Sequence, residues 1–249
     1  DRFARPFFGG IFLDRSLSVS SRMFQFVWRT LNEGNTVVPA LGIAEIPKQL
    51  AEGLNVRLGV RAVAVRPGEV ELSDGEVIRA DHVVVATESD AAAKLTGFDL
   101  PRSYRSSTCL YFEAARPPVD EPILILRGDA AGIVNEVVPV SVVAPETAPK
   151  GKHLVSVTVL GLDEQNDEVL AEAVIRDVET WLPGKGASGW RHLKTYRIRY
   201  AQMDQSPGVL SAKPSHATNL KGVWLAGEFT VHSSIQGAMQ SGRRVAEEI

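Results

Sequence analysis

The sequence predicts a mixed α/β fold in which helices and short strands alternate and a separate sheet is added. Residues 82–87 form an apolar, β-branched run without alternation, which is typical of a parallel strand buried on both faces. Helix-forming residues follow that strand over residues 89–95. Between residues 104 and 158, apolar runs are separated by Pro and Gly, which indicates an antiparallel or mixed sheet.

The first 50 residues are expected to hold loops and two helices, and Phe7-Phe8-Gly9-Gly10 breaks the pattern. A helix over residues 22–32, ended by Gly34, is predicted from apolar side chains at helical spacing: Met23, Phe26, Val27 and Leu31. A second helix is predicted over residues 43–53, with Pro47 in its first turn and one apolar side formed by Ile46, Leu50 and Leu54.

Residues 55–87 are expected to be β structure. Short strands are predicted around residues 56–60 and 63–65, and two further strands flank Asp74-Gly75. An Asp-Gly pair between such runs is a strong hairpin signal, because Gly accepts the positive φ of a tight turn.

The rest of the chain is predicted to add a sheet and its longest helix. Strands are expected at residues 108–114, 123–126, 134–143, 154–159 and 190–200, and a helix at 163–182. Residues 184–189 match the letters of the dinucleotide fingerprint G-x-G-x-x-G. Because they follow a helix and precede a strand, we interpret them as a connecting loop.

Composition excludes several classes of protein. The 27 Lys and Arg residues nearly balance the 30 Asp and Glu residues, and no basic block stands out, so nucleic acid is not an expected partner. The single cysteine, Cys109, excludes a disulfide framework and fits a small core residue in a reducing compartment. No His spacing suggests a metal site. No apolar run reaches the ~18 residues of a membrane span.

The most informative segment is residues 222–244. An apolar strand ends at Gly227 and Glu228, a short loop follows, and a helix opens near Ser233 or Ser234. That helix could pack close to a neighbour through its small residues Gly237, Ala238, Ser241 and Gly242. Its N-terminus would offer free N–H groups to an anionic or electron-rich ligand, and the acid could accept hydrogen bonds from ligand hydroxyls.

This segment resembles the C-terminal flavin-binding motif of the superfamily of flavin amine oxidases, phytoene desaturases and protoporphyrinogen oxidases. The resemblance implies the C-terminal part of a two-domain FAD-dependent oxidoreductase, with an incomplete dinucleotide-binding domain and a substrate domain of mixed sheet and helices. It also implies that Glu228 contacts the ribityl and phosphate region of FAD and that the helix opening near Ile235 directs its N-terminus at the flavin ring. Gly227, Ser234 and Gln236 belong to the same implied cofactor site. No catalytic residue is assigned.

Upstream residues extend the resemblance to the family's middle FAD-domain segment. It implies that Val63 meets the adenine through backbone atoms and that Ala86 and Thr87 pass near the cofactor. The resulting domains are a substrate domain of residues 1–50 and 97–200 and an FAD domain of residues 51–96 and 201–249.

Two departures from the family pattern bear on the substrate. Amine-oxidising members carry a Lys beside the flavin where alignment by eye puts Thr108, and an aromatic side chain where this sequence has Ser234 or Ile235. We therefore expect a phytoene desaturase-like enzyme that dehydrogenates a small apolar substrate by hydride transfer to flavin. A flavin amine oxidase and a non-catalytic binding or assembly module that retains the fold stay open as alternatives.

The chain begins at Asp1 and shows no strand, Gly-rich turn and helix of the pyrophosphate-binding kind, so we expect it to be a piece of a longer protein. By itself the chain is expected to bind FAD weakly or not at all. A truncated face should expose apolar surface, which would suit self-association. We expect a cytoplasmic protein, and contact with the periphery of a membrane is compatible with the sequence.

Overall fold

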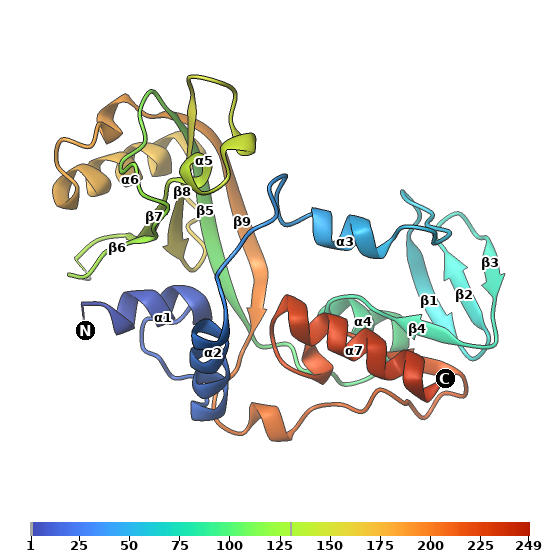
Figure 1. The fold of residues 1–249 in the computed structure, drawn as a ribbon. Coiled ribbons are helices and arrows are strands. Elements are labelled where there is room, and N and C mark those ends of the chain that lie inside the picture. The colour runs from blue at the N-terminus through green and yellow to red at the C-terminus, as the bar shows by residue number, and fades with distance from the viewer. Residues whose placement is uncertain (1, 130) are drawn as a thin grey trace. The chain divides into compact units, whose positions relative to one another are not determined.

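The computed structural model describes residues 2–129 and 131–249, and the chain divides into two compact units (Figure 1). The first unit runs up to Ser18 and then includes Phe24–Leu54 and Arg105–Ala201. The second unit combines Val19–Met23, Asn55–Tyr104 and Gln202–Ile249. Each unit is therefore assembled from segments that lie far apart in the sequence. Their assignment to a substrate domain and an FAD domain stays a prediction.

The first unit is built on a five-stranded sheet with the order β6-β7-β8-β5-β9. The pairs β5–β8, β7–β8 and β6–β7 are all antiparallel. The predicted sheet therefore forms, and it is antiparallel at these three pairs. Its strands are β5 (Tyr104–Ala114), β6 (Ile125–Leu126), β7 (Val134–Val138), β8 (His153–Leu160) and β9 (Arg191–Met203).

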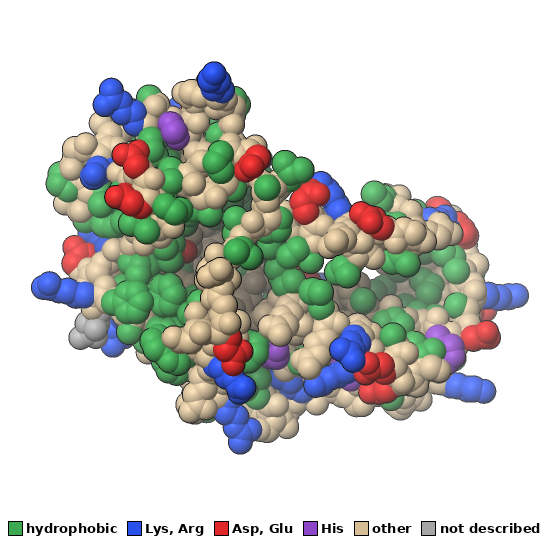
Figure 2. Space-filling model, viewed as in Figure 1, with side chains coloured by type: hydrophobic (Ala, Val, Ile, Leu, Met, Phe, Trp, Pro, Cys, Tyr) green, Lys and Arg blue, Asp and Glu red, His purple; other side chains and the backbone are tan. Residues whose placement is uncertain are grey.

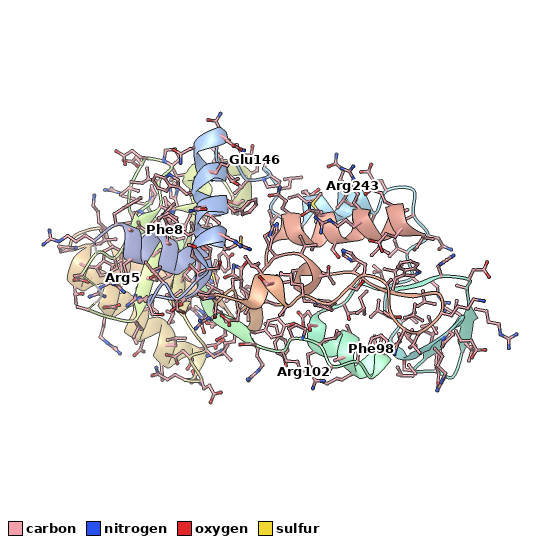
Figure 3. All side chains as sticks on the ribbon, turned by 90° about the horizontal axis from the view of Figure 1, so that it is seen from below. Arg5, Phe8, Phe98, Arg102, Glu146 and Arg243 are labelled. Carbon is pink, nitrogen blue, oxygen red and sulfur yellow. The ribbon has the colours of Figure 1, made fainter. Side chains whose placement is uncertain are left out.

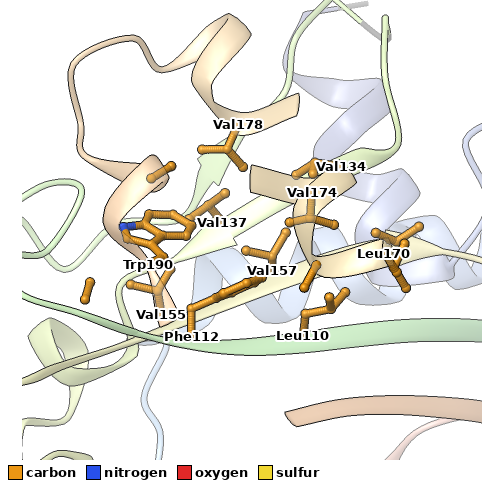
Figure 4. Packing of buried hydrophobic residues seen from close by; sticks show 14 residues of the cluster. Leu110, Phe112, Val134, Val137, Val155, Val157, Leu170, Val174, Val178 and Trp190 are labelled. Atoms are coloured by element: carbon orange, nitrogen blue, oxygen red, sulfur yellow. The ribbon is translucent and has the colours of Figure 1, made fainter. Parts of the chain in front are cut away.

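One face of this sheet is covered by helix α6 (Asp167–Trp181) (Figure 4). Leu110 and Phe112 of β5 alternate with side chains of the opposite face and are fully buried against Val174 and other residues of α6. The helix predicted over residues 163–182 is confirmed, but it begins later because the side chain of Asn166 caps it by accepting from the Glu168 N–H at 2.8 Å.

Two segments of the first unit, residues 139–143 and 184–189, test the predictions based on Pro and Gly. The strand predicted over residues 134–143 is wrong beyond Val138, because Pro139 cannot donate to a sheet and a short helix, α5 (Val140–Val143), follows it. The interpretation of residues 184–189 as a connecting loop is confirmed, since they lie between α6 and β9 and contain only the 3-10 turn Ala187–Gly189.

The N-terminal helices are α1 (Ala4–Phe12), α2 (Ser21–Glu33) and α3 (Glu45–Leu50). The expected break at Gly9-Gly10 is wrong, since both glycines lie inside α1, and a Cβ on Gly10 would come within 2.5 Å of a Glu136 carboxylate oxygen on β7. Phe8 of α1 packs on Phe24 of α2 with ring centroids 4.8 Å apart (Figure 3).

Helix α2 confirms the predicted helix, whereas α3 is shorter than predicted. The predicted apolar side of α3 is not buried, and Leu50 is 56% exposed. Figure 2 shows hydrophobic side chains on the surface near this segment. Among the described helices, none combines the length and apolarity needed to cross a bilayer.

The second unit contains a three-stranded antiparallel sheet formed by β1 (Ala62–Arg66), β2 (Glu69–Leu72) and β3 (Val77–Arg79). The Asp74-Gly75 hairpin is confirmed, with Gly75 at φ 90° between β2 and β3. The strands predicted around residues 56–60 do not form: Gly59 turns the chain at φ 73° and Leu58 is 88% exposed, without a strand partner to bury it.

A two-stranded parallel sheet completes this unit, made of β4 (Val83–Val85) and β10 (Val223–Leu225). The parallel strand predicted at residues 82–87 is confirmed, as is the helix after it, α4 (Ser89–Thr96). The predicted burial of β4 on both faces is wrong. Val83 and Val85 enter the core, whereas Val84, on the opposite face, is 42% exposed. Helix α7 (Ile235–Glu248) ends the chain, and its Arg243 is an exposed side chain (Figure 3).

Truncating the core of the first unit should destabilise it strongly. Leu110→Ala removes a fully buried side chain and should lower the free energy of unfolding by about 2–5 kcal/mol, measured by urea denaturation. Leu193→Ala, at a half-exposed position of the same sheet, is the control and should cost far less. Equal losses for the two variants would contradict the described packing of the sheet on α6.

Candidate functional site

The carboxyl ends of the two parallel strands lie side by side in the second unit. The Ala226 N–H donates to the Val85 carbonyl at 3.0 Å, so the pairing of β10 with β4 continues past the strand. Gly227 follows at φ 153°, where a Cβ would stand 2.6 Å from the Phe229 ring and 3.4 Å from the Thr87 carbonyl. Only Gly fits this position. The carboxyl ends of parallel strands are where open α/β sheets bind ligands.

Helix α7 is tied to this strand end by hydroxyl groups. The buried Ser241 Oγ accepts from the Gly227 N–H at 2.8 Å, and Thr230 Oγ1 donates to the Gly227 carbonyl at 2.8 Å. Gly237 lies so close to the preceding loop that a Cβ there would overlap the carbonyl oxygen of His232. The predicted close packing is therefore observed at Gly237 and Ser241, which fix where the helix begins, whereas Ala238 and Gly242 are exposed.

The N-terminus of α7 keeps unpaired donors. Ser234 is the N-cap residue, and its Oγ accepts from the Gly237 N–H at 2.9 Å, as the predicted helix opening requires. Within the part of the chain that the structure describes, no group accepts from the backbone N–H of Ile235 or Gln236, and both residues are exposed. These two donors and the helix dipole are available to an anionic or electron-rich ligand.

Glu228 lies beside that helix end with its carboxyl group held in place. Ser233 Oγ donates to Glu228 Oε2, and the Met203 N–H donates to Ser233 Oγ at 2.9 Å. Burial raises the pKa of the Glu228 carboxyl, although the Ser233 hydrogen bond and the Lys213 ammonium act to lower it. The carboxyl is therefore half-buried, oriented and able to accept a hydrogen bond from a ligand hydroxyl.

A buried amide completes the polar cluster. Gln205 Oε1 accepts from the Ser233 N–H at 3.3 Å, while Gln205 Nε2 is buried without an acceptor among the described residues. The cluster thus offers unpaired donors, one carboxyl group and a glycine at the strand end. FAD, with its hydroxyls, phosphates and polar ring edge, suits this donor set.

The other predicted cofactor residues lie in the same unit. Ala86 and Thr87 are exposed where β4 ends, next to Gly227. Val63 lies on β1, where the register shifts between Ala62 and Ala64, so it is the additional residue of a β-bulge. A bulge leaves backbone groups of the extra residue without a partner on the neighbouring strand, which suits a backbone contact with a ligand. The structure thus gathers Thr87, Gly227, Glu228 and the start of α7, and leaves Val63 on a separate sheet.

The sequence model of the flavin containing amine oxidoreductases matches residues 1–249. The chain belongs to this family. Members of this family are FAD-dependent oxidoreductases, and the predicted resemblance and fold class are confirmed. No curated protein sequence matches the chain significantly.

Solved structures share the fold of this family member. An oxidoreductase from Methanosarcina mazei is 20% identical with a TM-score of 0.76, and the match covers 99% of this chain and 64% of that protein. A protein assigned as a protoporphyrinogen oxidase from Exiguobacterium is 18% identical at TM-score 0.61, with 84% and 51% covered. Reduced UDP-galactopyranose mutase is 15% identical at TM-score 0.70, with 99% and 64% covered. The chain therefore spans less than two thirds of these relatives.

The position of Thr108 corrects one argument from the sequence. Thr108 is fully buried on the α6 side of β5, where its Oγ1 donates to the Gly161 carbonyl at 2.9 Å and accepts from the Asp163 N–H at 3.1 Å. Its side chain is therefore held in the core and is not presented to a ligand, so Thr108 does not decide the substrate class. Its neighbour Cys109 lies on the opposite face of the sheet and is half-buried, with its Sγ 3.2 Å from Ser156 Oγ. The expectation that Cys109 is a core residue is therefore wrong.

Sequence reasoning missed the residues that hold Glu228. Ser233 was visible next to the predicted cap, and a hydroxyl five residues after the acid was the available signal. Gln205 belongs to no motif and reaches the site only through the fold. Among the described residues, no cluster of three or more metal-ligating side chains occurs.

Substituting the closely packed glycine of α7 should displace the helix from the flavin site. Gly237→Ala would drive a methyl group into the His232 carbonyl, so we expect both lower thermal stability and weaker FAD binding in the full-length protein. Gly242→Ala on the same helix meets nothing within 4 Å and should be neutral or stabilising by about 0.5–1 kcal/mol. A Gly237→Ala variant that melts and binds FAD like wild type would refute the close contact.

Removing the carboxyl group should release flavin. In the full-length protein, Glu228→Ala should weaken FAD binding roughly ten- to hundredfold, because a hydrogen bond to a charged group contributes about 1.5–3 kcal/mol. Fluorescence titration of the apo-protein measures this affinity. Glu248→Ala, at the exposed far end of α7, is the control and should leave it unchanged. Wild-type affinity in the Glu228 variant would show that Glu228 is not a ligand.

Proposed function

We propose that the protein is an FAD-dependent oxidoreductase of the phytoene desaturase-like kind, which dehydrogenates an apolar substrate. Bound FAD would supply the acceptor for a hydride from the substrate. The observation that supports the substrate class is the uncovered face of the sheet in the first unit, by which we mean the side of β5, β8 and β9 that lies opposite α6.

That face holds an apolar cavity of about 500 Å³. Its lining comes from β5, β8 and β9 and consists of Cys109, Tyr111, Leu154, Leu193, Lys194, Tyr196 and Ile198. The rings of Tyr111 and Tyr196 meet edge to face with centroids 5.9 Å apart. Large apolar side chains that stay exposed together on one face mark a binding surface rather than a core.

β5 and β8 present their part of this face rigidly, because their alternate residues are locked in the core against α6, and β9 pairs with β5 beside them. Burial raises the pKa of the Cys109 thiol, which keeps it neutral and unreactive toward electrophiles at pH 7. The face therefore favours an uncharged, apolar substrate, and its residues position that substrate and exclude water.

A flavin amine oxidase is the second candidate, and one residue favours it. Lys194 lines the same cavity, with its Nζ 6.0 Å from the centroid of the Tyr196 ring. No Lys lies on β5, but this Lys reaches the uncovered face from β9. An amine oxidase that uses a lysine beside the flavin would depend on Lys194.

Anaerobic flavin bleaching separates the candidates. The full-length, FAD-loaded protein should bleach with carotenoid precursors or porphyrinogens and not with small primary amines. Lys194→Met should retain that activity, because the lysine only borders the apolar cavity.

Three results would count against the proposal. Rapid bleaching by a small primary amine that is lost in Lys194→Met would establish the amine oxidase. Bleaching by none of these compounds in protein that retains FAD would favour a non-catalytic module. A protein that does not bind FAD at all would refute the flavoenzyme itself.

A further inference from the structure

Lys213 is a half-buried cation that lacks a partner. Among the described residues it makes no hydrogen bond and no ion pair. Burial lowers the pKa of its ammonium from 10.5 to about 8, although the Glu228 carboxyl acts to raise it. Holding a cation away from water costs free energy unless an anion or acceptors compensate. The fold thus keeps a partly buried ammonium group near the Glu228 carboxyl, without an ion pair or hydrogen bond among the described residues.

The course of the chain brings Lys213 toward the end of β10, where Glu228 lies. Ala217 forms an antiparallel bridge with Trp224, and the Leu225 N–H donates to the His216 carbonyl at 2.8 Å. The segment before β10 therefore runs antiparallel to it. The chain that leads back from His216 to Lys213 therefore heads toward the end of β10, after which Glu228 follows. The two charges interact, yet no ion pair within 4.0 Å joins them in the described structure.

Other charged groups surround the same place. His232 lies near both Lys213 and Arg244, and burial together with these two cations lowers the pKa of its imidazole. Glu88 is the further acid that acts on Glu228, and it is exposed. Positive charge therefore gathers beside the unpaired N–H groups at the start of α7, and the buried Gln205 Nε2 belongs to the same cluster.

We propose that Lys213 is a cofactor-binding residue whose ammonium group contacts a phosphate of FAD, near Glu228. This inference rests on the proposed flavin site and adds a residue that the sequence does not mark. Glu228 would receive hydroxyls of the cofactor, while Lys213 would neutralise its phosphate charge.

The test compares three variants of the full-length protein: Lys213→Met, Lys213→Arg and the control Lys221→Met, at an exposed lysine of the turn before β10. At pH 7, Lys213→Met should weaken FAD binding about tenfold or more, as expected for a lost charged hydrogen bond. Lys213→Arg should restore most of the affinity and Lys221→Met should not change it. None of the three should lower the melting temperature of the apo-protein, and riboflavin, which lacks phosphate, should bind all of them alike.

The pH profile supplies a second readout. Because phosphate favours the protonated lysine, wild-type affinity for FAD should fall as the pH rises through about 8, where free Lys213 loses its proton. Lys213→Arg stays charged throughout and should show a flat profile between pH 7 and 9. His232 does not interfere, since its lowered pKa places its titration below this window.

The outcomes separate the inference from the proposed function. Unchanged FAD affinity in Lys213→Met, or equal weakening of riboflavin, would overturn the phosphate contact and leave the flavoenzyme intact. A wild-type pH profile in Lys213→Arg would also overturn it. Failure of the wild-type full-length protein to bind FAD would overturn both the flavin site and the role of Lys213.

Discussion

The close contact between α7 and the loop after β10 is the constraint on which the second unit depends. Gly237 lies against the His232 carbonyl, and the Ser241 hydroxyl reaches back to the Gly227 N–H. Any side chain at Gly237 would push the helix off the strand ends. Because the helix is held there, its first two N–H groups lie in the same cluster as Glu228 and the end of β4.

The electrostatics of the site follow from that contact. Glu228 is oriented by Ser233, whose hydroxyl in turn accepts from the backbone of β9 at Met203. The buried Gln205 amide without an acceptor is costly in the absence of a ligand, and together with Lys213 it would suit the proposed cofactor, which carries both hydroxyls and negative charge. The first unit contrasts with this, since its uncovered sheet face is apolar and aromatic. Under the proposed function, the second unit would hold the polar cofactor and the first would bind the apolar substrate.

Sequence patterns predicted the helices and strands that are determined by residues close together in the sequence. Alternation and turn chemistry located the β2–β3 hairpin, and helical spacing with caps located α2, α6 and α7. The prediction failed where tertiary contacts decide. Gly9 and Gly10 lie inside α1, where Gly10 packs close to Glu136 of β7 and Gly9 close to Arg15. Strands at residues 56–60 do not form because no partner strand buries them.

The residues of the candidate site also fall into those predictable from neighbouring residues and those that depend on tertiary contacts. The strand–acid–loop–helix order made Glu228 and Ser234 visible in the sequence, since their roles depend on neighbours within a few residues. Thr108 was expected to face a ligand, but the alternation of the strand turns its side chain into the core, and a sequence alone does not say which face of a strand is covered. Gln205 and Lys213 could not be found, because only the course of the chain around β10 brings them to Glu228.

Hydrogen–deuterium exchange of the full-length protein, with and without FAD, tests the central claim most directly. The account predicts that FAD slows exchange at residues 227–240, most of all at the Ile235 and Gln236 amides that lack an acceptor in the described structure. Residues 167–181 of α6, in the other unit, should not respond. Saturation with FAD that leaves the amides at the start of α7 exchanging at their original rate would contradict the account.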